Sequence, residues 1–186
     1  ENADEENPGP RRAAPRVRLT SNAGMNRLTW DFNTDAGFMV PPGAYKLKMT
    51  AGSFTDTEPL TLTIDPRLAA DRITAADLRE QYEHNVRMRD MVNEVNRLAA
   101  RVRAERTKVQ GSTDAHANEV RAIATTLFGA GEGIRYGQPG LQTNITYLAG
   151  MTTRVDQKVG QDAIDRYREL RKELDAVEAR AGKVVP

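Results

Sequence analysis

Histidine is the side chain best suited to metal binding and proton transfer near neutral pH, and this chain contains two. His84 and His116 lie on segments whose spacing predicts two different helices. Glu83 and Asp90 are close to His84 along the chain, but a zinc site needs three or more converging ligands. We therefore expect His84 to be a surface or boundary residue of a helix rather than a metal ligand.

Asp31 is the second candidate, because a carboxylate held beside an aromatic ring in a cleft can act as a general acid. It directly follows Trp30. In a turn, the same carboxylate accepts a hydrogen bond from a backbone amide or pairs with an arginine. We expect this structural role for Asp31.

A glycine-rich segment, Gly129-Ala130-Gly131-Glu132-Gly133, has the composition of a phosphate-binding loop. It lacks the lysine and the Ser/Thr of a Walker loop, and the pattern before it is helical rather than that of a strand. We expect a flexible connection between two helices at this point.

Arginines are frequent between residues 87 and 106, where acidic residues are interspersed among them. The arginines are Arg87, Arg89, Arg97, Arg101, Arg103 and Arg106. This mixture is typical of a solvated helix face, whereas nucleic-acid binding needs a concentrated basic patch with aromatic residues in it. The formal net charge is +1 and aromatic residues make up 5% of the chain, so we predict no nucleic-acid partner.

Composition sets the remaining bounds. The chain has 186 residues, 39% of them hydrophobic and 28% charged, which fits one globular domain or two small ones. It contains no cysteine, which excludes disulfides and thiolate chemistry. No apolar run approaches the roughly 20 residues of a membrane span. We predict no catalytic set, metal, cofactor, small-molecule ligand or direct membrane span.

Between residues 17 and 66, apolar residues alternate with polar ones at the period of β-strands. The alternating sets are Leu28, Trp30 and Phe32, then Tyr45, Leu47 and Met49, then Leu60, Leu62 and Ile64. We predict a small antiparallel β-sandwich, with four or five strands where an immunoglobulin-like sandwich has about seven, so that it is incomplete. Its structural core is predicted to contain Leu28, Trp30, Phe32, Tyr45, Leu47 and Leu62.

From residue 72 to residue 182 the apolar period becomes helical. Thr74 with Asp77 three residues later predicts a capping box at the start of a helix of about 35 residues, about 50 Å long. Asp114 is suited to cap a second helix, and two more follow, the last from about Gln161. We predict an α+β chain in which an antiparallel bundle of three or four helices follows the sandwich.

The first sixteen residues contain three prolines and four acidic side chains without apolar periodicity, which predicts an extended arm over residues 1–16. Alone, such an arm should be mobile, whereas a partner surface would hold it in place. Contacts with such a partner are predicted at Pro8, Pro10, Arg11, Arg12 and Pro15.

Four motifs carry a resemblance to a known family. They are Asn26-Arg27-Leu28-Thr29-Trp30-Asp31, Pro41-Pro42-Gly43-Ala44-Tyr45, Pro59-Leu60-Thr61-Leu62 and Asp65-Pro66-Arg67. Roughly residues 17–180 resemble the fibronectin-type-III-like segment and helical region that follow the sortilin-like, BNR-repeat β-propellers of secreted, glycosyl-hydrolase-like bacterial proteins. The sequence has neither the propellers nor the strand pair that usually precedes the first motif. Any carbohydrate chemistry of that family would belong to the propeller.

Two functions fit these expectations. The first is a non-catalytic structural or interaction module, an exported accessory or scaffold subunit of a larger assembly, including a membrane-associated respiratory or photosynthetic one. The alternative is a C-terminal accessory domain detached from a secreted hydrolase-like propeller protein. The N-terminal residue is Glu rather than Met, so we expect a processed N-terminus. As an exported subunit, the chain is expected in the periplasm or at the cell surface. Both functions predict other protein subunits as partners and no enzymatic activity. The open edge of the sandwich would be covered by the arm, by the long helix or by a partner strand.

Overall fold

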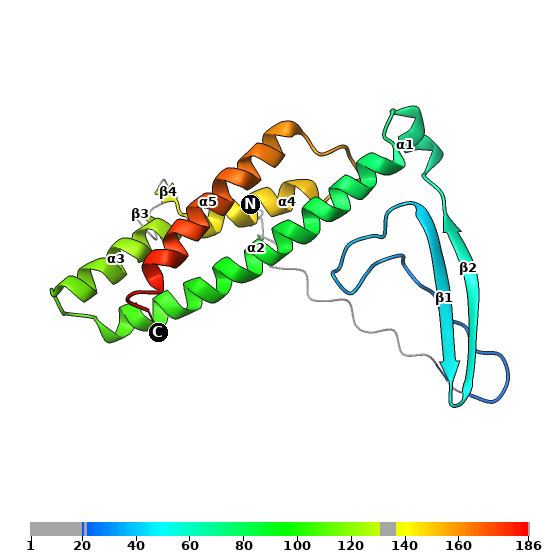
Figure 1. Cartoon of the computed structure of the whole chain (residues 1–186), viewed down its shortest axis with the longest axis horizontal. Coiled ribbons are helices and arrows are strands. Elements are labelled where there is room, and N and C mark those ends of the chain that lie inside the picture. Colours follow the sequence, from blue (N-terminus) through cyan, green and yellow to red (C-terminus); the bar gives the residue numbers. More distant parts are fainter. Residues whose placement is uncertain (1–19, 21, 131–136, 186) are drawn as a thin grey trace, which may run out of the picture. The chain divides into compact units, whose positions relative to one another are not determined.

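The computed structural model describes residues 20, 22–130 and 137–185. The chain is α+β, and it divides into two compact units, Glu1–Ile64 and Asp65–Pro186 (Figure 1). Strands dominate the described part of the first unit, and helices dominate the second.

The first unit is built on a β-hairpin. Strands β1 (Gly43–Ala51) and β2 (Phe54–Leu62) pair antiparallel along their whole length. Gly52 begins the two-residue loop between them with φ 61°, the left-handed conformation that a type II′ hairpin turn needs at this position. Pro59 lies inside β2, which is tolerated because a two-stranded sheet consists of edge strands only.

The alternating set of Leu28, Trp30 and Phe32 does not form a strand, so this part of the predicted sandwich is wrong. Within the described ranges, residues 26–32 have no ladder partner, and an isolated bridge joins Asn33 to Met39 just beyond them. Two local features end the extended backbone here. Phe32 has φ 61°, and the Asp31 carboxylate accepts a hydrogen bond from the Asn33 amide at 3.1 Å, as in an Asx turn. Among the described residues of this unit, the hairpin is therefore the only sheet.

The predicted sandwich core is also corrected. Leu28, Phe32 and Leu47 are 45%, 41% and 53% exposed. Trp30, Tyr45 and Leu62 are half-buried. These side chains cannot enclose one another because no second sheet packs on the hairpin within the described part of the unit.

The helical unit starts with two capped helices. The short helix α1 (Pro66–Ala70), which the sequence analysis did not predict, is followed by α2 (Ala75–Lys108). Thr74 and Asp77 form the predicted capping box, and α2 has 34 residues, so the prediction of one long helix is confirmed. Buried positions recur at helical spacing from Leu78 to Glu105, and most of those from Met88 onward are apolar.

Three more helices pack along α2 (Figure 1). They are α3 (Ala115–Phe128), α4 (Leu141–Thr152) and α5 (Gln161–Ala181), and a small antiparallel pair, β3 (Gly129–Ala130) with β4 (Gln138–Pro139), lies between α3 and α4. Asp114 caps α3 as predicted, by accepting the Ala117 amide proton. The glycine-rich segment thus contributes a strand at Gly129–Ala130, while residues 131–133 lie outside the described ranges.

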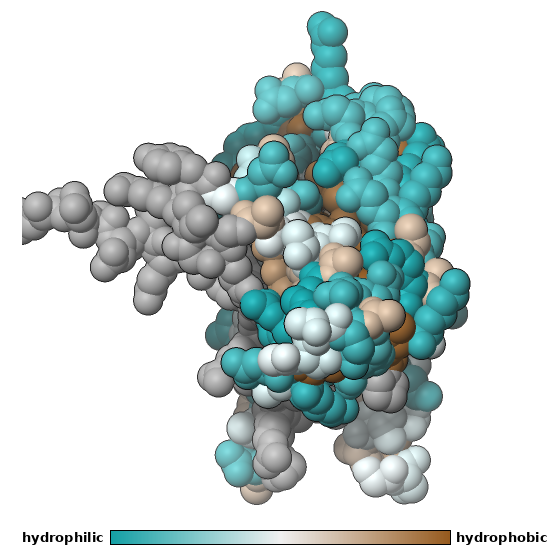
Figure 2. Space-filling model, turned by 90° about the vertical axis from the view of Figure 1, so that its left-hand side faces the viewer, coloured by the Kyte–Doolittle hydropathy of each residue, from teal (hydrophilic) through white to brown (hydrophobic). Residues whose placement is uncertain are grey.

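One hydrophobic core joins these four helices. It includes Met88, Met91, Val95, Val102, Ile123, Leu127, Ile145, Leu170 and Leu174, each at most 1% exposed. A bidentate ion pair between Arg171 of α5 and Glu94 of α2 lies at its edge. The face in Figure 2 is covered mainly by hydrophilic residues, with hydrophobic side chains visible in the gaps between them. The helical unit therefore has a complete interior of its own.

Candidate interaction surface

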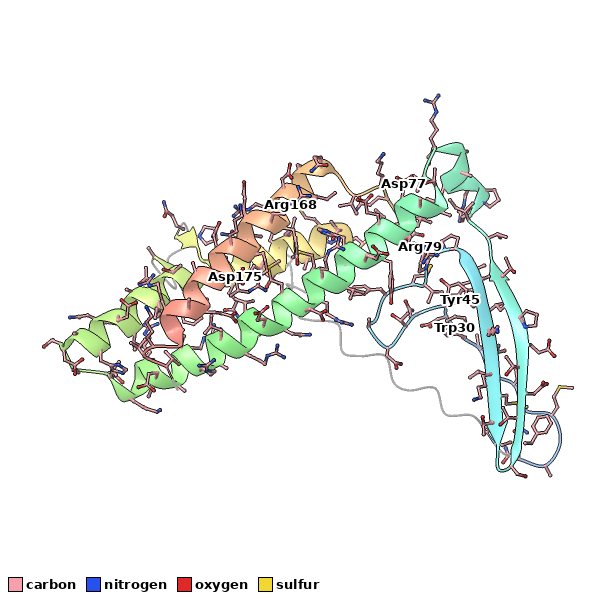
Figure 3. All side chains as sticks on the ribbon, in the orientation of Figure 1. Trp30, Tyr45, Asp77, Arg79, Arg168 and Asp175 are labelled. Atoms are coloured by element: carbon pink, nitrogen blue, oxygen red, sulfur yellow. The ribbon has the colours of Figure 1, made fainter. Side chains whose placement is uncertain are left out.

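The register of the hairpin assigns each side chain to one of its two faces. Directly opposite residues in an antiparallel pair share a face, and successive residues alternate between faces. Tyr45 pairs with Leu60, and Leu47 with Glu58. We call the face that contains them the apolar face, and Figure 3 shows the side chains of the hairpin, with Tyr45 labelled.

The apolar face is open to solvent toward the hairpin turn. It consists of Gly43, Tyr45, Leu47, Met49 and Ala51 of β1 with Phe54, Asp56, Glu58, Leu60 and Leu62 of β2. Leu47, Met49 and Phe54 are each at least half exposed. The face therefore combines large uncovered hydrophobic side chains with two carboxylates.

The opposite face is polar and basic. It consists of Ala44, Lys46, Lys48 and Thr50 of β1 with Thr55, Thr57, Pro59 and Thr61 of β2. The hydroxyl oxygens of Thr50 and Thr55 lie 3.4 Å apart across the strands, as expected for cross-strand neighbours on one face. The hairpin is therefore amphipathic, with both lysines of β1 directed away from the apolar face.

The first unit has almost no interior among its described residues. Within residue 20 and residues 22–64, Pro41 is the only buried residue. The ten exposed large hydrophobic residues of the described chain include seven from this unit, namely Met25, Leu28, Phe32, Met39, Leu47, Met49 and Phe54. An isolated two-stranded hairpin is at best marginally stable in water, so this unit needs a covering surface.

Asp31 has the structural role expected from the sequence. Its carboxylate accepts hydrogen bonds from the Asn33 backbone amide at 3.1 Å and from the Asn33 side-chain amide at 2.8 Å. These bonds lower the pKa of Asp31, because they stabilise its charged form. Trp30 donates its indole proton to the Asn33 carbonyl at 2.9 Å and packs edge-on against Phe32. The Asp31 carboxylate thus stabilises the turn at Asn33.

His84 is buried rather than at the surface or boundary, so this prediction is wrong. It is 1% exposed, packs edge-on against Tyr167 of α5, and its Nε2 has no hydrogen-bond partner among the described residues. Burial lowers the pKa of His84, and the neighbouring charge of Arg87 lowers it further. The signal for burial was its spacing of four residues from Met88, which places both on one helix face.

The second histidine bridges two helices. Nε2 of His116 on α3 lies 3.2 Å from a carboxylate oxygen of Glu105 on α2, and Lys108 lies 2.9 Å from the other oxygen. Hydrogen bonds from Lys108 and His116 hold the pKa of Glu105 below its ordinary value. The described residues contain no group of three or more His, Asp or Glu side chains placed to hold a metal ion.

Two of the arginines expected on a solvated helix face, Arg101 and Arg103, are exposed and also make contacts within the helical unit. Arg103 donates to the Gln142 side chain at 3.0 Å and stacks over the Phe128 ring at 4.2 Å. Arg101 donates to the Val185 carbonyl at 2.8 Å.

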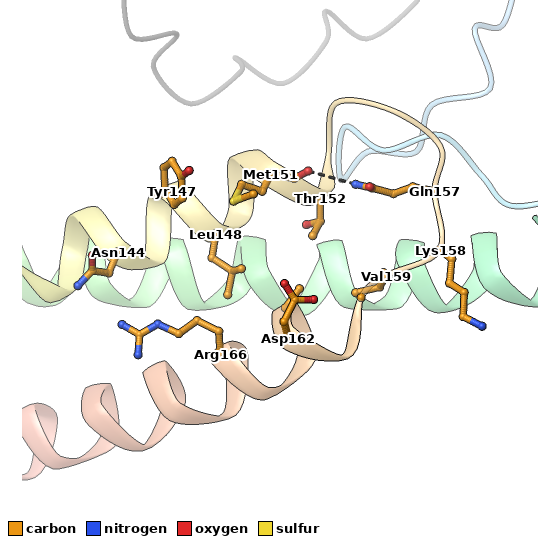
Figure 4. Close-up of a pocket in the computed structure, with 12 residues that line it drawn as sticks. Asn144, Tyr147, Leu148, Met151, Thr152, Gln157, Lys158, Val159, Asp162 and Arg166 are labelled. Atoms are coloured by element: carbon orange, nitrogen blue, oxygen red, sulfur yellow. Dashed lines mark hydrogen bonds between the residues drawn. The ribbon is translucent and has the colours of Figure 1, made fainter.

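A recess of about 500 Å³ lies between α4, α5 and the loop that joins them (Figure 4). Met151 lies on its α4 side, and the Gln157 side chain donates to the Met151 carbonyl across the loop. The basic side chains around it already have partners. Lys158 lies 3.8 Å from the carboxylate of Asp77, and Arg166 lies 2.9 Å from that of Glu169. Among the described residues that line the recess, both basic side chains, Lys158 and Arg166, are therefore already paired with carboxylates.

The predicted partner contacts Pro8, Pro10, Arg11, Arg12 and Pro15 lie outside the described residues. None of the helices in the described ranges is sufficiently long and apolar to cross a membrane. Comparisons of the chain with protein-family models, with curated proteins and with solved structures found no match.

Proposed function

We propose that this chain is a non-catalytic interaction module, an exported accessory or scaffold subunit of a larger assembly. In this role the helical unit is the self-sufficient scaffold, and the hairpin unit is the part that binds another protein. The partner would be another subunit, in the periplasm or at the cell surface. The assembly could be a membrane-associated one, such as a respiratory or photosynthetic complex.

The contrast between the two units supports this proposal. The helical unit buries large side chains such as Ile123 and Leu170 completely, whereas Leu47, Met49 and Phe54 of the hairpin are at least half exposed. Burial of a fully exposed side chain of this size is worth about 1.5–3 kcal/mol, so covering the exposed half of each of these residues gains roughly half of that and favours a covered apolar face. A protein that places its uncovered hydrophobic residues in one small element is suited to bind through that element.

The hairpin would then become one layer of a two-layer structure. Sheets pack face to face about 10 Å apart, with apolar side chains interdigitating between them. A sheet from the partner that lies on the apolar face would supply the second layer that the described part of this unit lacks. In the alternative function, the upstream part of a propeller protein would supply this second layer.

The native mass of the chain tests the proposal. The tagged chain should be extracted gently from its source and separated under native conditions, and a variant with Leu47→Thr, Met49→Thr and Phe54→Thr should be treated in parallel. We expect the natural chain to migrate in a larger assembly and the variant to migrate near 20.6 kDa. A variant with Thr55→Ser and Thr57→Ser on the opposite face is the matched control and should stay in the assembly. Migration of the natural chain near 20.6 kDa would reject the proposal.

A further inference from the structure

The apolar face carries negative charge and no positive charge. Glu58 lies opposite Leu47, and Asp56 lies opposite Met49, so each carboxylate is placed beside an exposed hydrophobic side chain. Among the described residues, neither carboxylate forms an ion pair. The lysines of β1, Lys46 and Lys48, belong to the opposite face.

Covering this face therefore raises an electrostatic requirement. A hydrophobic surface that lay on Leu47 and Met49 would also take Asp56 and Glu58 partly out of water. A desolvated carboxylate is strongly unfavourable without a counter-charge, so the covering surface has to supply cations at these two points. The backbone amide of Thr57, which donates to Asp56 at 2.8 Å, supplies one hydrogen bond but no charge.

We infer that the apolar face binds a different protein, whose contacting surface is apolar and presents lysine or arginine side chains opposite Asp56 and Glu58. This inference rests on the proposed interaction function and specifies the partner's surface. Arginine suits the position best, because its guanidinium pairs with a carboxylate through two parallel hydrogen bonds.

The apolar face of a second copy does not meet the requirement. Two apolar faces packed against each other would bring together four carboxylates, two from each copy, with no lysine or arginine between them. Like charges brought together at an interface disfavour that pairing, whereas a basic partner is selected by the same charges. The inferred complex is therefore heteromeric.

Site-specific photo-crosslinking can identify the protein that covers the apolar face. A photoreactive benzoylphenylalanine would replace Met49 in one variant and Lys48 in another, because these neighbours point to opposite faces. In the native assembly we expect the probe at residue 49 to crosslink to one other protein, at a peptide that contains or adjoins lysine or arginine. The probe at residue 48 should not give this product. A crosslink from residue 49 to a second copy, or to residues 1–42 or 65–186 of the same chain, would overturn the inference.

Reversing the charges of Asp56 and Glu58 then tests whether the partner presents lysine or arginine side chains to them. Asp56→Lys with Glu58→Lys should weaken the complex with the crosslinked protein roughly tenfold or more, and should remove most of its sensitivity to salt. Lys46→Glu with Lys48→Glu on the opposite face is the control and should leave the affinity within about twofold. A complex that depends on Leu47 and Met49 but is unaffected by reversal at Asp56 and Glu58 would reject the basic partner and leave the interaction function standing. Absence of any assembly would reject the interaction function itself.

Discussion

Asn85 of α2 and Thr152 of α4 exchange two hydrogen bonds inside the helical unit. The Asn85 amide donates to the Thr152 carbonyl at 3.1 Å, and the Thr152 hydroxyl donates to the Asn85 side-chain oxygen at 2.8 Å. Gln81, one turn earlier, donates to the Thr152 and Val155 carbonyls and accepts the Gln157 amide proton. The end of α4 and the loop after it are thus fixed to α2 by side-chain hydrogen bonds.

Loss of the Asn85 side chain should destabilise the helical unit. Asn85→Ala removes the acceptor of the buried Thr152 hydroxyl and one of the two donors to the Thr152 carbonyl, which keeps Gln81, at a cost of about 1–3 kcal/mol. Urea unfolding followed by circular dichroism measures this change. Asn93→Ala, at an exposed position of the same helix, should change stability by less than about 0.5 kcal/mol. Equal effects of the two substitutions would contradict the buried hydrogen-bond network.

Two glycines permit a close backbone approach between α3 and α4. A Cβ atom at Gly129 would lie 2.0 Å from the Gln138 carbonyl oxygen, and one at Gly140 would lie 2.3 Å from that of Leu127. Gly129→Ala and Gly140→Ala should each lower the melting temperature, because the neighbouring atoms are backbone and cannot move aside. Gly150→Ala in α4, where nothing lies within 4 Å, should instead raise stability by about 0.5–1 kcal/mol. A neutral Gly140→Ala variant would contradict the close approach.

The buried imidazole of His84 should make stability depend on pH. Its pKa is lowered in the folded chain, so the unfolded chain binds more protons once the pH falls below the ordinary value of 6.5. Stability from this residue is therefore complete above about pH 6.5 and decreases on acidification toward the lower folded pKa. His84→Gln should flatten the change in unfolding free energy between pH 7.5 and 5, whereas His116→Gln should leave the His84 contribution in place. Unchanged pH dependence in His84→Gln would contradict the lowered pKa.

The two units should respond differently to loss of a large side chain. Ile123 is fully buried, so Ile123→Ala should cost the helical unit about 2–5 kcal/mol. Trp30 is only half-buried, and Trp30→Ala should leave the unfolding of the helices unchanged. Far-ultraviolet circular dichroism reports the helical transition in both variants. A large loss of helical stability in Trp30→Ala would show that the indole is part of the helical core.

Much of the helical unit could be predicted because its signals are local. The capping box of Thr74 and Asp77 and the cap at Asp114 each act within three residues, and the structure forms both. The burial of His84 was missed because its face of α2 also carries Gln81 and Asn85, whose polar character conceals the apolar period. Their partner Thr152 is 67 residues from Asn85 in the sequence, and short-range patterns do not reveal such a contact.

The hairpin unit was predicted less well. Alternation identified β1 correctly, and it located the later half of β2. The same alternation at Leu28, Trp30 and Phe32 did not produce a strand, because the turn at Asp31 and the positive φ of Phe32 redirect the backbone. A period-two pattern indicates which residues would share a face of a strand, but a strand also needs a neighbour to pair with. The described residues supply no such neighbour for the segment with Leu28, Trp30 and Phe32.

Amide hydrogen exchange of the hairpin, compared between the purified chain and the chain in its native assembly, tests the central claim most directly. In the purified chain, we expect the amides of residues 43–62 to exchange many times faster than those of the core of α2, because the apolar face has no cover. In the assembly, the same amides should become strongly protected while those of α2 stay as they are. Strong protection of residues 43–62 in the purified, monomeric chain would contradict the claim, because the hairpin would then be stable without a partner.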